Sequence, residues 1–389
     1  MTGSSLLPSV LLGVLLTGAL GCGSSTTTAP SPSPSSDAGT SGVTCAAAPY
    51  QDRGPYAVGV TTLDVGGIPT EVWYPVEPRD AAGKPRASYD MRDWLPPADR
   101  AKISDADTPL HETSAVRDLP LAKGERRPVL LFSHGLGGYR LQSTFLTTHL
   151  ASWGFVVVAP DHPERGLAIV VAGDLTKVDV SKAPDQLRAA LARMKQEDGD
   201  AGSRFAGALD FTRIGTFGHS MGGNTAALVG ADAEVKATVL LAAPGPATAL
   251  GKPLLMMWGA VDGVAKPSSV QSSFDRQSAP KRALSLRGAG HLAFTDLCTI
   301  AADKGGVLQV AIDHGIAVDD LVKQLGSDGC GAQKDGTPYL APEAGWAPID
   351  HYVTATFRSA LGIDPKPIGL DGAAAACFGD RIASSDAQP

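Results

Sequence analysis

The chain has 389 residues, of which 43% are hydrophobic and 19% are charged, and its formal net charge at pH 7 is −7. This balance is typical of a globular protein and excludes a disordered or membrane-spanning chain. The acidic excess argues against a nucleic-acid partner, because phosphate binding requires a basic stripe and the sequence contains none. The length is ample for one large domain.

The N-terminal residues predict an export signal followed by a flexible tether. The apolar run Leu6–Leu20 is too short to span a membrane comfortably and occupies the place of a signal peptide's apolar region. Ala19-Leu-Gly-Cys22 resembles a bacterial lipobox, which predicts a signal peptide over residues 1–22 and a lipid on Cys22. The basic start of such a signal is missing, so plain secretion and a buried apolar helix remain alternatives. Residues 23–45 are rich in Ser, Thr, Pro and Gly, which predicts a disordered tether. We expect an exported protein, attached to the bacterial cell envelope through lipid or else secreted.

The five cysteines divide into one lipid site and two disulfides. With Cys22 assigned to lipid, Cys45, Cys298, Cys330 and Cys377 form an even number in an oxidising compartment. Cys298 and Cys330 flank a single loop, so we favour that pair, with Cys45 and Cys377 tying the two ends together. No Cys-x-x-Cys and no histidine cluster with metal-ligand spacing occurs, so we expect no metal and no other cofactor.

Strands and helices alternate along the chain from residue 46 to residue 365. Two N-terminal strands precede a polar, Pro-rich excursion, after which short apolar strands alternate with helices. The expected strands are Val58–Val65, Glu71–Val76, Val129–Phe132, Phe155–Ala159, Arg213–Phe217, Ala237–Ala242, Leu254–Trp258 and Lys281–Leu286. The expected helices are Arg140–Trp153, Ala183–Lys195, Met221–Val229, Val270–Gln277 and Tyr352–Leu361. Continuous apolar strands separated by helices predict a doubly wound α/β domain with a mostly parallel sheet. Residues 366–389 are left as a C-terminal tail.

Two insertions interrupt this pattern, at about residues 77–127 and 292–347. Connections of this length often form lids or binding walls. Four side chains of the first insertion are candidate pocket or lipid-facing residues, although ordinary packing of a surface excursion is the more common arrangement. They are Tyr89, Met91, Trp94 and Leu95.

A five-residue motif supplies a candidate nucleophile. Gly218-His-Ser-Met-Gly222 matches Gly-x-Ser-x-Gly and lies between a predicted strand and a helix of small residues. The turn is so sharp that its two outer positions must be small, and it holds the Ser220 hydroxyl clear of the sheet at the positive end of the helix. A Gly-rich turn with an inert serine is the alternative, but the strand–turn–helix context favours a nucleophile.

A serine hydroxyl attacks only when a base takes its proton, so a histidine and an acid are needed as partners. Two loops that follow later strands qualify, Trp258-Gly-Ala-Val-Asp262 and Gly288-Ala-Gly-His291. Their order along the chain is serine, acid, histidine, and each is expected at the carboxyl end of its strand. We therefore predict a triad of Ser220, Asp262 and His291. Asp296 is the rival acid, although it lies close to His291 in the sequence.

The oxyanion formed by such an attack needs two backbone amides that are fixed in advance. One is expected from Met221, the residue after the candidate nucleophile. The other is expected from Leu136, in the loop His134-Gly-Leu-Gly-Gly138, where glycines let the backbone turn its amides inward. His162 ends a strand at the same edge of the sheet, and we interpret it as a residue that shapes the loop.

These motifs resemble those of the α/β-hydrolase superfamily. Within it they are most similar to the platelet-activating-factor acetylhydrolase group and to bacterial relatives often labelled predicted dienelactone hydrolases. The resemblance covers roughly residues 50–362 and rests on Tyr56–Val60, Glu71–Pro75, Leu131–Arg140, Gly218–Gly223 and Gly290-His291. It implies an α/β-hydrolase fold and a serine carboxylesterase (EC 3.1.1) acting on short-chain or phospholipid-like esters. It also implies the same triad and the same oxyanion donors as the residues themselves.

The sequence departs from two related groups. Dienelactone hydrolases proper use a cysteine nucleophile, whereas this motif holds Ser220. Cutinases and polyester hydrolases usually carry a tryptophan after the proline that ends the next strand and an aromatic residue in the oxyanion loop. This chain has Ala243-Pro-Gly245 and Leu136 at those places. The alternatives that remain are a lipase or cutinase-like polyester hydrolase, and a surface-anchored binding protein on a disabled hydrolase fold. We expect a monomer whose partner is a small-molecule or lipid-like ester.

Overall fold

The structure is a computed structural model that describes residues 45–389 except residue 174. The predicted signal peptide, the tether up to residue 44 and the lipid site at Cys22 lie outside the described residues. No helix within the described part of the chain is long and apolar enough to cross a membrane.

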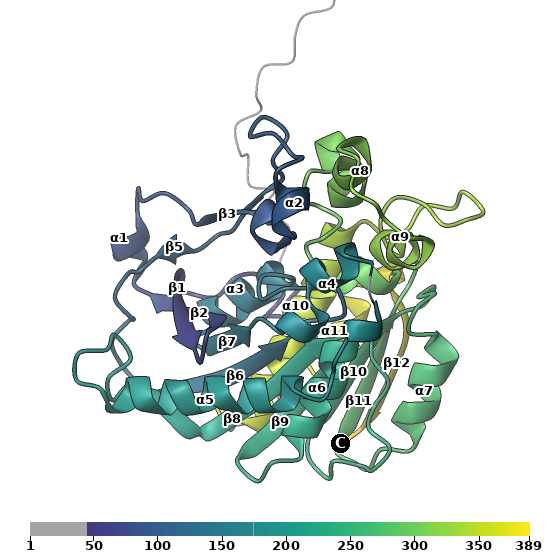
Figure 1. Ribbon diagram of the computed structural model, residues 1–389. Helices are drawn as coiled ribbons and strands as arrows, with labels where there is room; N and C mark the ends of the chain where they lie inside the picture. Colours follow the sequence, from purple (N-terminus) through teal and green to yellow (C-terminus); the bar gives the residue numbers. More distant parts are fainter. Residues whose placement is uncertain (1–44, 174) are drawn as a thin grey trace, which may run out of the picture. The chain divides into compact units, whose positions relative to one another are not determined.

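A ten-stranded mixed sheet forms the centre of the described chain (Figure 1). Its strand order is β12-β11-β10-β9-β8-β6-β7-β2-β1-β5. Six neighbouring strands are parallel to one another, namely β11, β10, β9, β8, β6 and β7. On either side of them, β12 and β2 run antiparallel to their neighbours. The strands are β1 (Ala57–Val65), β2 (Ile68–Val76), β5 (Val116–Arg117), β6 (Arg127–Ser133), β7 (Val156–Pro160), β8 (Leu209–His219), β9 (Val235–Leu241), β10 (Leu254–Gly259), β11 (Lys281–Leu286) and β12 (Ile382–Gln388). The predicted mostly parallel α/β sheet is therefore present.

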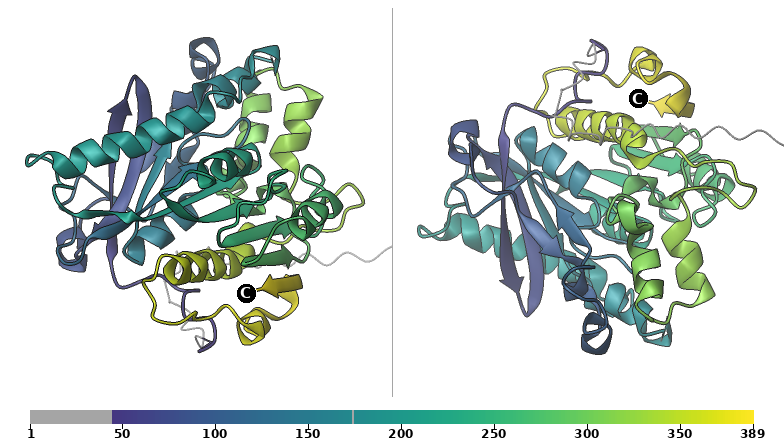
Figure 2. Two further views of the ribbon diagram at one scale, coloured as in Figure 1. Left: turned by 90° about the horizontal axis from the view of Figure 1, so that it is seen from below. Right: turned by 90° about the horizontal axis from the view of Figure 1, so that it is seen from above.

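Helices cover both faces of this sheet, as the two views in Figure 2 show. Along β6, Leu130 and Phe132 belong to a core that α3 and α10 share, whereas Val129 and Leu131 pack with α5. On the same face as α5, α6 and α7 cover β9 and β10. These helices are α3 (Thr144–Ser152), α5 (Ala183–Gly199), α6 (Met221–Gly230), α7 (Pro267–Asp275) and α10 (Pro342–Ala360). Buried residues on both sides of each central strand explain why the strands have continuous apolar sequences.

The C-terminal segment, which the sequence left as a tail, adds to the sheet. It forms α11 (Gly372–Ala376) and β12, and β12 pairs antiparallel with β11. The sequence did not indicate this strand because most of its residues are exposed, so it lacks an apolar pattern. Both favoured disulfides are present, Cys45–Cys377 with a Cα–Cα distance of 5.8 Å and Cys298–Cys330 with 5.2 Å. The fold therefore continues past residue 365.

The two insertions form short elements rather than a separate domain. The first contains α1 (Pro78–Ala81), a hairpin of β3 (Ser88–Asp90) and β4 (Leu110–Glu112), a short 3₁₀ helix (Met91–Trp94) and α2 (Pro97–Arg100). The second contains α8 (Gly306–Asp313) and α9 (Asp320–Ser327). Residues 91–109 and the helices α8 and α9 meet α4 (Leu167–Val171) and the loops that follow β6 and β11 around one cavity. In Figure 1, α2, α4, α8 and α9 lie on this side of the sheet, whereas α1 lies apart from them.

Candidate active site

Loops at the carboxyl ends of three parallel strands carry the predicted triad. Ser220 follows β8, Asp262 follows β10 and His291 follows β11. The structure joins two of them directly, because His291 Nδ1 lies 2.9 Å from Asp262 Oδ2, and both residues are buried. Ser220 lies at the same edge, since the ring of its neighbour His219 lies 4.7 Å from the His291 ring, centroid to centroid. Within the described residues no hydrogen bond joins the Ser220 hydroxyl to His291, so the structure brings these two residues to one edge without bonding them.

The turn at Ser220 has the strained geometry that the motif predicts. Ser220 has φ of 55° and ψ of −124°, in a region that residues with a side chain rarely adopt. A Cβ atom at Gly218 would lie 2.2 Å from the carbonyl oxygen of Gly222, and one at Gly222 would lie 2.0 Å from the carbonyl oxygen of Ser133. Only glycine fits at either place. Strain of this kind persists where the surrounding structure enforces it, and it is concentrated at functional sites.

Two backbone amides near Ser220 are free to bind an oxyanion. Met221 begins α6, so its N–H has no partner inside the helix. In the loop after β6, the N–H of Leu136 has no acceptor among the described residues, whereas its neighbours do. Those neighbouring bonds run from Gly135 N–H to Gln142 Oε1, from Gly137 N–H to Arg165 O, and from Gly138 N–H to Gly135 O. The two donors predicted from the sequence are thus the unbonded ones.

Gln142 and His219 connect the oxyanion loop to the candidate base. Gln142 Oε1 accepts the Gly135 N–H at 2.9 Å, and Gln142 Nε2 donates to His219 Nδ1. His219 Nε2 then donates to the carbonyl oxygen of His291 at 3.0 Å. Because a carbonyl only accepts, the proton of His219 resides on Nε2. Burial holds the pKa of His219 well below its usual 6.5, so this ring stays neutral. No motif in the sequence marks Gln142, so its role could not be predicted.

Asp328 fixes the backbone beside both the acid and the base. Its Oδ1 accepts the N–H of His291 at 2.6 Å, and its Oδ2 accepts the N–H of Gly263 at 2.9 Å. Its carbonyl oxygen accepts the N–H of Leu292 at 2.7 Å. Asp328 follows α9 and lies two residues before Cys330, so the second insertion is tied to the candidate site. No motif or spacing in the sequence distinguishes this aspartate.

An apolar cavity of about 140 Å³ adjoins the candidate site. It touches Leu136, a candidate oxyanion donor, and Leu292, the residue after the candidate base. Most of its wall comes from the two insertions and α4. The lining residues are Met91, Arg92, Leu95, Ile103, Pro109, Leu136, Gly137, Tyr139, Leu167, Val170, Val171, Leu292, Leu297, Val307, Leu308, Ala311, Val318, Val322, Leu325 and Gly326. Such a cavity suits an apolar ligand group.

The four candidate pocket residues of the first insertion separate in the structure. Met91 and Leu95 line the apolar cavity. Tyr89 is buried and donates a hydrogen bond to Glu71 Oε1 at 2.6 Å, and the Trp94 ring packs 4.9 Å from the ring of Tyr139. Two of the four thus take part in a pocket and two have the packing role given as the alternative.

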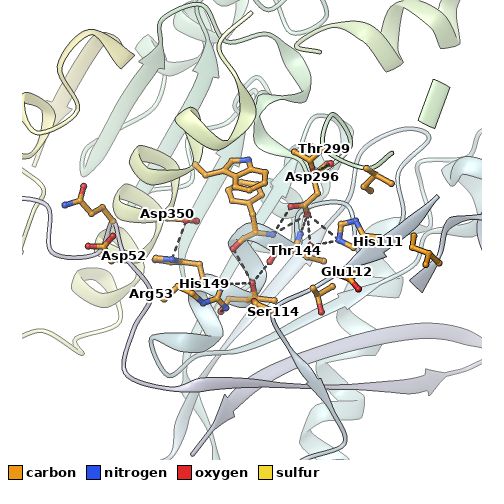
Figure 3. A pocket seen from close by; sticks show the side chains of 17 residues that line it. Asp52, Arg53, His111, Glu112, Ser114, Thr144, His149, Asp296, Thr299 and Asp350 are labelled. Atoms are coloured by element: carbon orange, nitrogen blue, oxygen red, sulfur yellow. Dashed lines mark hydrogen bonds and ion pairs between the residues drawn. The ribbon is translucent and has the colours of Figure 1, made fainter. Parts of the chain in front are cut away.

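A larger, polar cavity of about 720 Å³ opens elsewhere and contains none of the predicted triad residues (Figure 3). Residues from α3, α10, β4 and the segment 51–53 surround it. It contains a His149–Asp350 contact of 3.4 Å. Size alone therefore does not identify the site, because Leu136, a candidate oxyanion donor, and Leu292, the neighbour of His291, line the smaller cavity.

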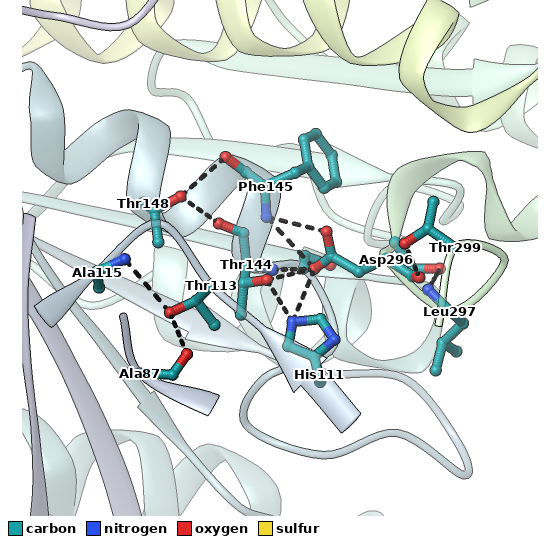
Figure 4. A network of polar contacts seen from close by, with 12 residues as sticks. Ala87, His111, Thr113, Ala115, Thr144, Phe145, Thr148, Asp296, Leu297 and Thr299 are labelled. Atoms are coloured by element: carbon teal, nitrogen blue, oxygen red, sulfur yellow. Dashed lines mark hydrogen bonds and ion pairs between the residues drawn. The ribbon is translucent and has the colours of Figure 1, made fainter. Parts of the chain in front are cut away.

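Asp296, the rival acid, borders this polar cavity and is bonded away from His291 (Figure 4). Its carboxylate accepts hydrogen bonds from the backbone N–H and the hydroxyl of Thr144 and from the N–H of Phe145, at the start of α3. His111 Nε2 donates to the Thr144 hydroxyl. Burial raises the pKa of Asp296 to about 7. Asp262 therefore binds His291, whereas Asp296 binds the backbone amides at the start of α3.

His162 has the surroundings of a residue that shapes a loop. Its Nε2 accepts a hydrogen bond from the Ser133 hydroxyl at 2.8 Å, and its Nδ1 donates to Gln186 Oε1 at 2.7 Å. Its backbone N–H donates to His134 Nε2 at 2.9 Å. Burial lowers the pKa of His162 to about 3, so it stays neutral.

No group of three or more His, Cys, Asp or Glu side chains in the described part of the chain could hold a metal ion.

Comparison with known proteins gives partial matches. Residues 102–201 match a family model described as platelet-activating factor acetylhydrolase, isoform II. The platelet-activating factor acetylhydrolases of Cavia porcellus and Canis lupus familiaris are 43% identical to this chain over 49 residues and 44% identical over 50 residues. Each match covers 13% of this chain and 11% of the relative, so the chain spans about a tenth of the curated relatives' length. This chain therefore resembles these acetylhydrolases, as the motifs predicted.

The family match includes only part of the candidate site. It contains the oxyanion loop His134–Gly138 and the whole of the helix α3 beyond it, and it ends before Ser220. The triad therefore rests on the geometry described above, independently of the matched segment.

Proposed function

We propose that this protein is a serine carboxylesterase on an α/β-hydrolase fold, which hydrolyses esters through an acyl-enzyme on Ser220. The observation that carries the proposal is the 2.9 Å hydrogen bond between His291 Nδ1 and Asp262 Oδ2, at the sheet edge where the serine turn lies. Because Asp262 binds Nδ1, the other ring nitrogen is left to take the serine proton. The resemblance to the acetylhydrolases supports an ester as the substrate.

Acylation begins when Ser220 Oγ attacks the carbonyl carbon of the ester. As the new O–C bond forms, the serine proton moves to His291 Nε2, and the carbonyl oxygen becomes an oxyanion bound by the amides of Leu136 and Met221. The oxyanion then collapses, the bond to the alcohol oxygen breaks, and the alcohol leaves with the proton from His291. Asp262 fixes the imidazole tautomer and stabilises its charged form without taking the proton.

Deacylation repeats these steps with water. His291 takes a proton from a water molecule as its oxygen attacks the acyl carbon, and the same two amides hold the second oxyanion. When this intermediate collapses, the bond to Ser220 Oγ breaks and the serine recovers its proton from His291. The net reaction converts one ester and one water molecule into a carboxylic acid and an alcohol.

The apolar cavity supports a short-chain or phospholipid-like ester as the substrate. It adjoins Leu136 and Leu292, so an apolar group bound there would lie beside the reacting carbonyl. Its volume of about 140 Å³ is close to that of cavities of about 150 Å³ that hold a benzene-sized molecule. An acyl chain of a few carbon atoms therefore fits without movement of the insertions.

The proposal includes export of the protein and a lipid anchor on Cys22. Two disulfides within the described residues support an oxidising compartment. Incorporation of labelled palmitate in the wild type but not in a Cys22→Ser variant would support the anchor, and equal labelling of both would contradict it.

A pair of serine variants tests the proposed reaction. Purified wild-type protein is expected to hydrolyse p-nitrophenyl acetate and to react once with a fluorophosphonate probe. Ser220→Ala should abolish both reactions, whereas Ser272→Ala, which changes an exposed hydroxyl on α7, should change neither. Turnover or labelling retained in Ser220→Ala would contradict the nucleophile, and an inactive wild type would contradict the esterase function itself.

A further inference from the structure

Arg165 is a fully buried arginine that has no acidic partner among the described residues. Its exposed fraction is 0%, and no carboxylate lies within ion-pair distance of it in the described part of the chain. Burial lowers its pKa to about 9, so the guanidinium still carries its charge at neutral pH. Its Nε has no hydrogen-bond partner among the described residues. A buried charge of this kind opposes folding unless its surroundings compensate it.

The groups that surround Arg165 belong to the two segments that carry the candidate oxyanion donors, the end of β6 with its following loop and the start of α6. On one side, its Nη2 donates to the Ser133 hydroxyl and to the carbonyl oxygen of His134, both at 2.7 Å. On the other side, its Nη1 donates to Thr225 Oγ1 at 2.9 Å and to the carbonyl oxygen of Met221 at 3.3 Å. One planar guanidinium therefore bridges the loop after β6 and the first turn of α6.

The backbone of Arg165 holds the same loop a second time. Its carbonyl oxygen accepts the N–H of Gly137 at 2.8 Å, directly after Leu136. Arg165 therefore holds the chain on both sides of Leu136. Its backbone binds Gly137, which follows Leu136, and its side chain binds His134, which lies two residues before Leu136. The nearby imidazoles of His134 and His162 cannot supply positive charge, because burial holds the pKa of each far below its usual value.

We propose that Arg165 is a positioning residue for the oxyanion hole, which clamps its two backbone donors and places a fixed positive charge behind them. This inference rests on the proposed esterase function. An oxyanion exists only in the transition state and the tetrahedral intermediates, so donors held in place for it, with a positive charge on the segments that carry them, lower the barrier without tightening substrate binding. The energetic cost of burying Arg165 is therefore explained by the reaction rather than by folding.

The proposal predicts a change in turnover rather than in substrate affinity. In Arg165→Met the side chain keeps much of its length and loses both the charge and the fork of donors. We expect kcat for p-nitrophenyl acetate to fall by about 10²-fold, while KM stays within about threefold. In Arg165→Lys, which keeps a charge but cannot bridge both loops, we expect an intermediate fall of about tenfold.

Arg127 offers a matched control. It lies at the start of β6, whereas Arg165 binds Ser133 at the end of that strand. Arg127 is buried with an exposed fraction of 7%, and donates to the carbonyl oxygens of Ala122 and Lys123 and to the Tyr56 hydroxyl. Arg127→Met removes a buried arginine of similar bonding far from the site. We expect it to lower thermal stability and to leave kcat per active site unchanged.

Active-site titration separates the proposed role from a loss of folded protein. The endpoint of fluorophosphonate labelling counts the competent molecules of each variant, and kcat is expressed per labelled site. If kcat per site in Arg165→Met lies within about threefold of that in Arg127→Met, the proposal is overturned. If Arg165→Met does not fold, Arg165→Lys decides, and an unchanged kcat per site overturns it. An inactive wild type, or an active Ser220→Ala variant, would instead refute the esterase function.

Discussion

The candidate catalytic edge and the cap differ in how their contacts are made. The catalytic edge comprises the loops that carry Ser220, Asp262 and His291 together with the oxyanion loop His134–Gly138. There, directional hydrogen bonds hold the rings of His219 and His291 and the backbone amides of Gly135 and His291. The cap comprises α4, α8, α9 and residues 91–109. Of the cap residues that line the cavity, only Arg92 is charged, and it pairs with Asp90 and Asp105.

We expect the two regions to control different properties of the reaction. Hydrogen bonds require a specific distance and angle, so the edge holds its groups in one arrangement and the rate of reaction depends on that arrangement. Apolar contacts depend mainly on shape and area, so we expect the cap to select a substrate by its volume. Substitutions at the edge should change the rate for every ester, and substitutions in the cap should change which ester reacts.

The largest expected effect comes from the acid of the edge. Asp262→Asn should lower kcat by about 10⁴-fold, because an amide next to His291 Nδ1 favours the wrong imidazole tautomer. Asp296→Asn is the matched control, since it removes another buried carboxylate of the same neighbourhood that bonds to α3 instead. Its kcat should remain within about threefold of the wild type.

Steady-state hydrolysis of p-nitrophenyl acetate by the two variants, normalised to titrated sites, decides between these aspartates. A severe loss in Asp296→Asn with a mild loss in Asp262→Asn would reverse the assignment of the acid. Equal losses of kcat in both variants would show that contact with His291 does not decide which carboxylate the reaction requires.

A second prediction concerns the link between the edge and the second insertion. Asp328→Asn leaves one oxygen to accept from either His291 or Gly263, and its amide group repels the other N–H. Misplacement of a reacting group by about 1 Å costs up to about 10²-fold in rate, so we expect a fall in kcat of that order. The control is Asp319→Asn, at the exposed start of α9 in the same insertion, which should leave kcat unchanged. A normal rate in Asp328→Asn would mean that the base keeps its place without this bond.

Local patterns in the sequence predicted most of the edge. The strand–turn–helix context of Ser220 and the glycine-flanked loops after two later strands were sufficient to identify the residues that lie together. Gln142 and Asp328 could not be predicted, because their roles depend on contacts with residues 77 and 37 positions away. The strand β12 was missed for a related reason, since an exposed edge strand carries no apolar periodicity.

The cap was predicted only as two long insertions. Which of its side chains meet in a cavity depends on how short helices from residues 91–109, 167–171 and 306–327 pack together. Apolar residues carry no mark that distinguishes pocket from core, as the division between Met91 and Tyr89 illustrates. Periodicity cannot supply this information, because it reports one element at a time.

We also expect stability to depend on pH through Asp296, which borders the polar cavity. Burial raises the pKa of Asp296 to about 7 in the folded protein, whereas an unfolded aspartate has a pKa near 3.8. Between these values the unfolded state loses its proton while the folded state keeps it, so the contribution of Asp296 to stability falls as the pH rises and is lowest above pH 7. Because asparagine does not titrate, Asp296→Asn does not undergo this loss of stability as the pH rises. The free energy of unfolding of Asp296→Asn relative to wild type should therefore increase by about 2 kcal/mol from pH 5 to pH 8.

Urea unfolding of both proteins at the two pH values measures this difference, and groups common to both cancel. A relative stability that stays constant, or one that falls with rising pH, would contradict the raised pKa.

The smallest expected effect lies in the cap and concerns substrate choice. Ala311 on α8 lines the apolar cavity, so Ala311→Phe should fill part of its volume of about 140 Å³. We expect kcat/KM for p-nitrophenyl hexanoate to fall about tenfold relative to acetate, because lost burial of one or two methylene groups accounts for a change of that size. Ile312→Phe, at the neighbouring exposed position with an exposed fraction of 42%, should leave the ratio unchanged. If Ala311→Phe slowed acetate and hexanoate equally, the cavity would act on the rate rather than on the choice of substrate, and the distinction between edge and cap would not hold.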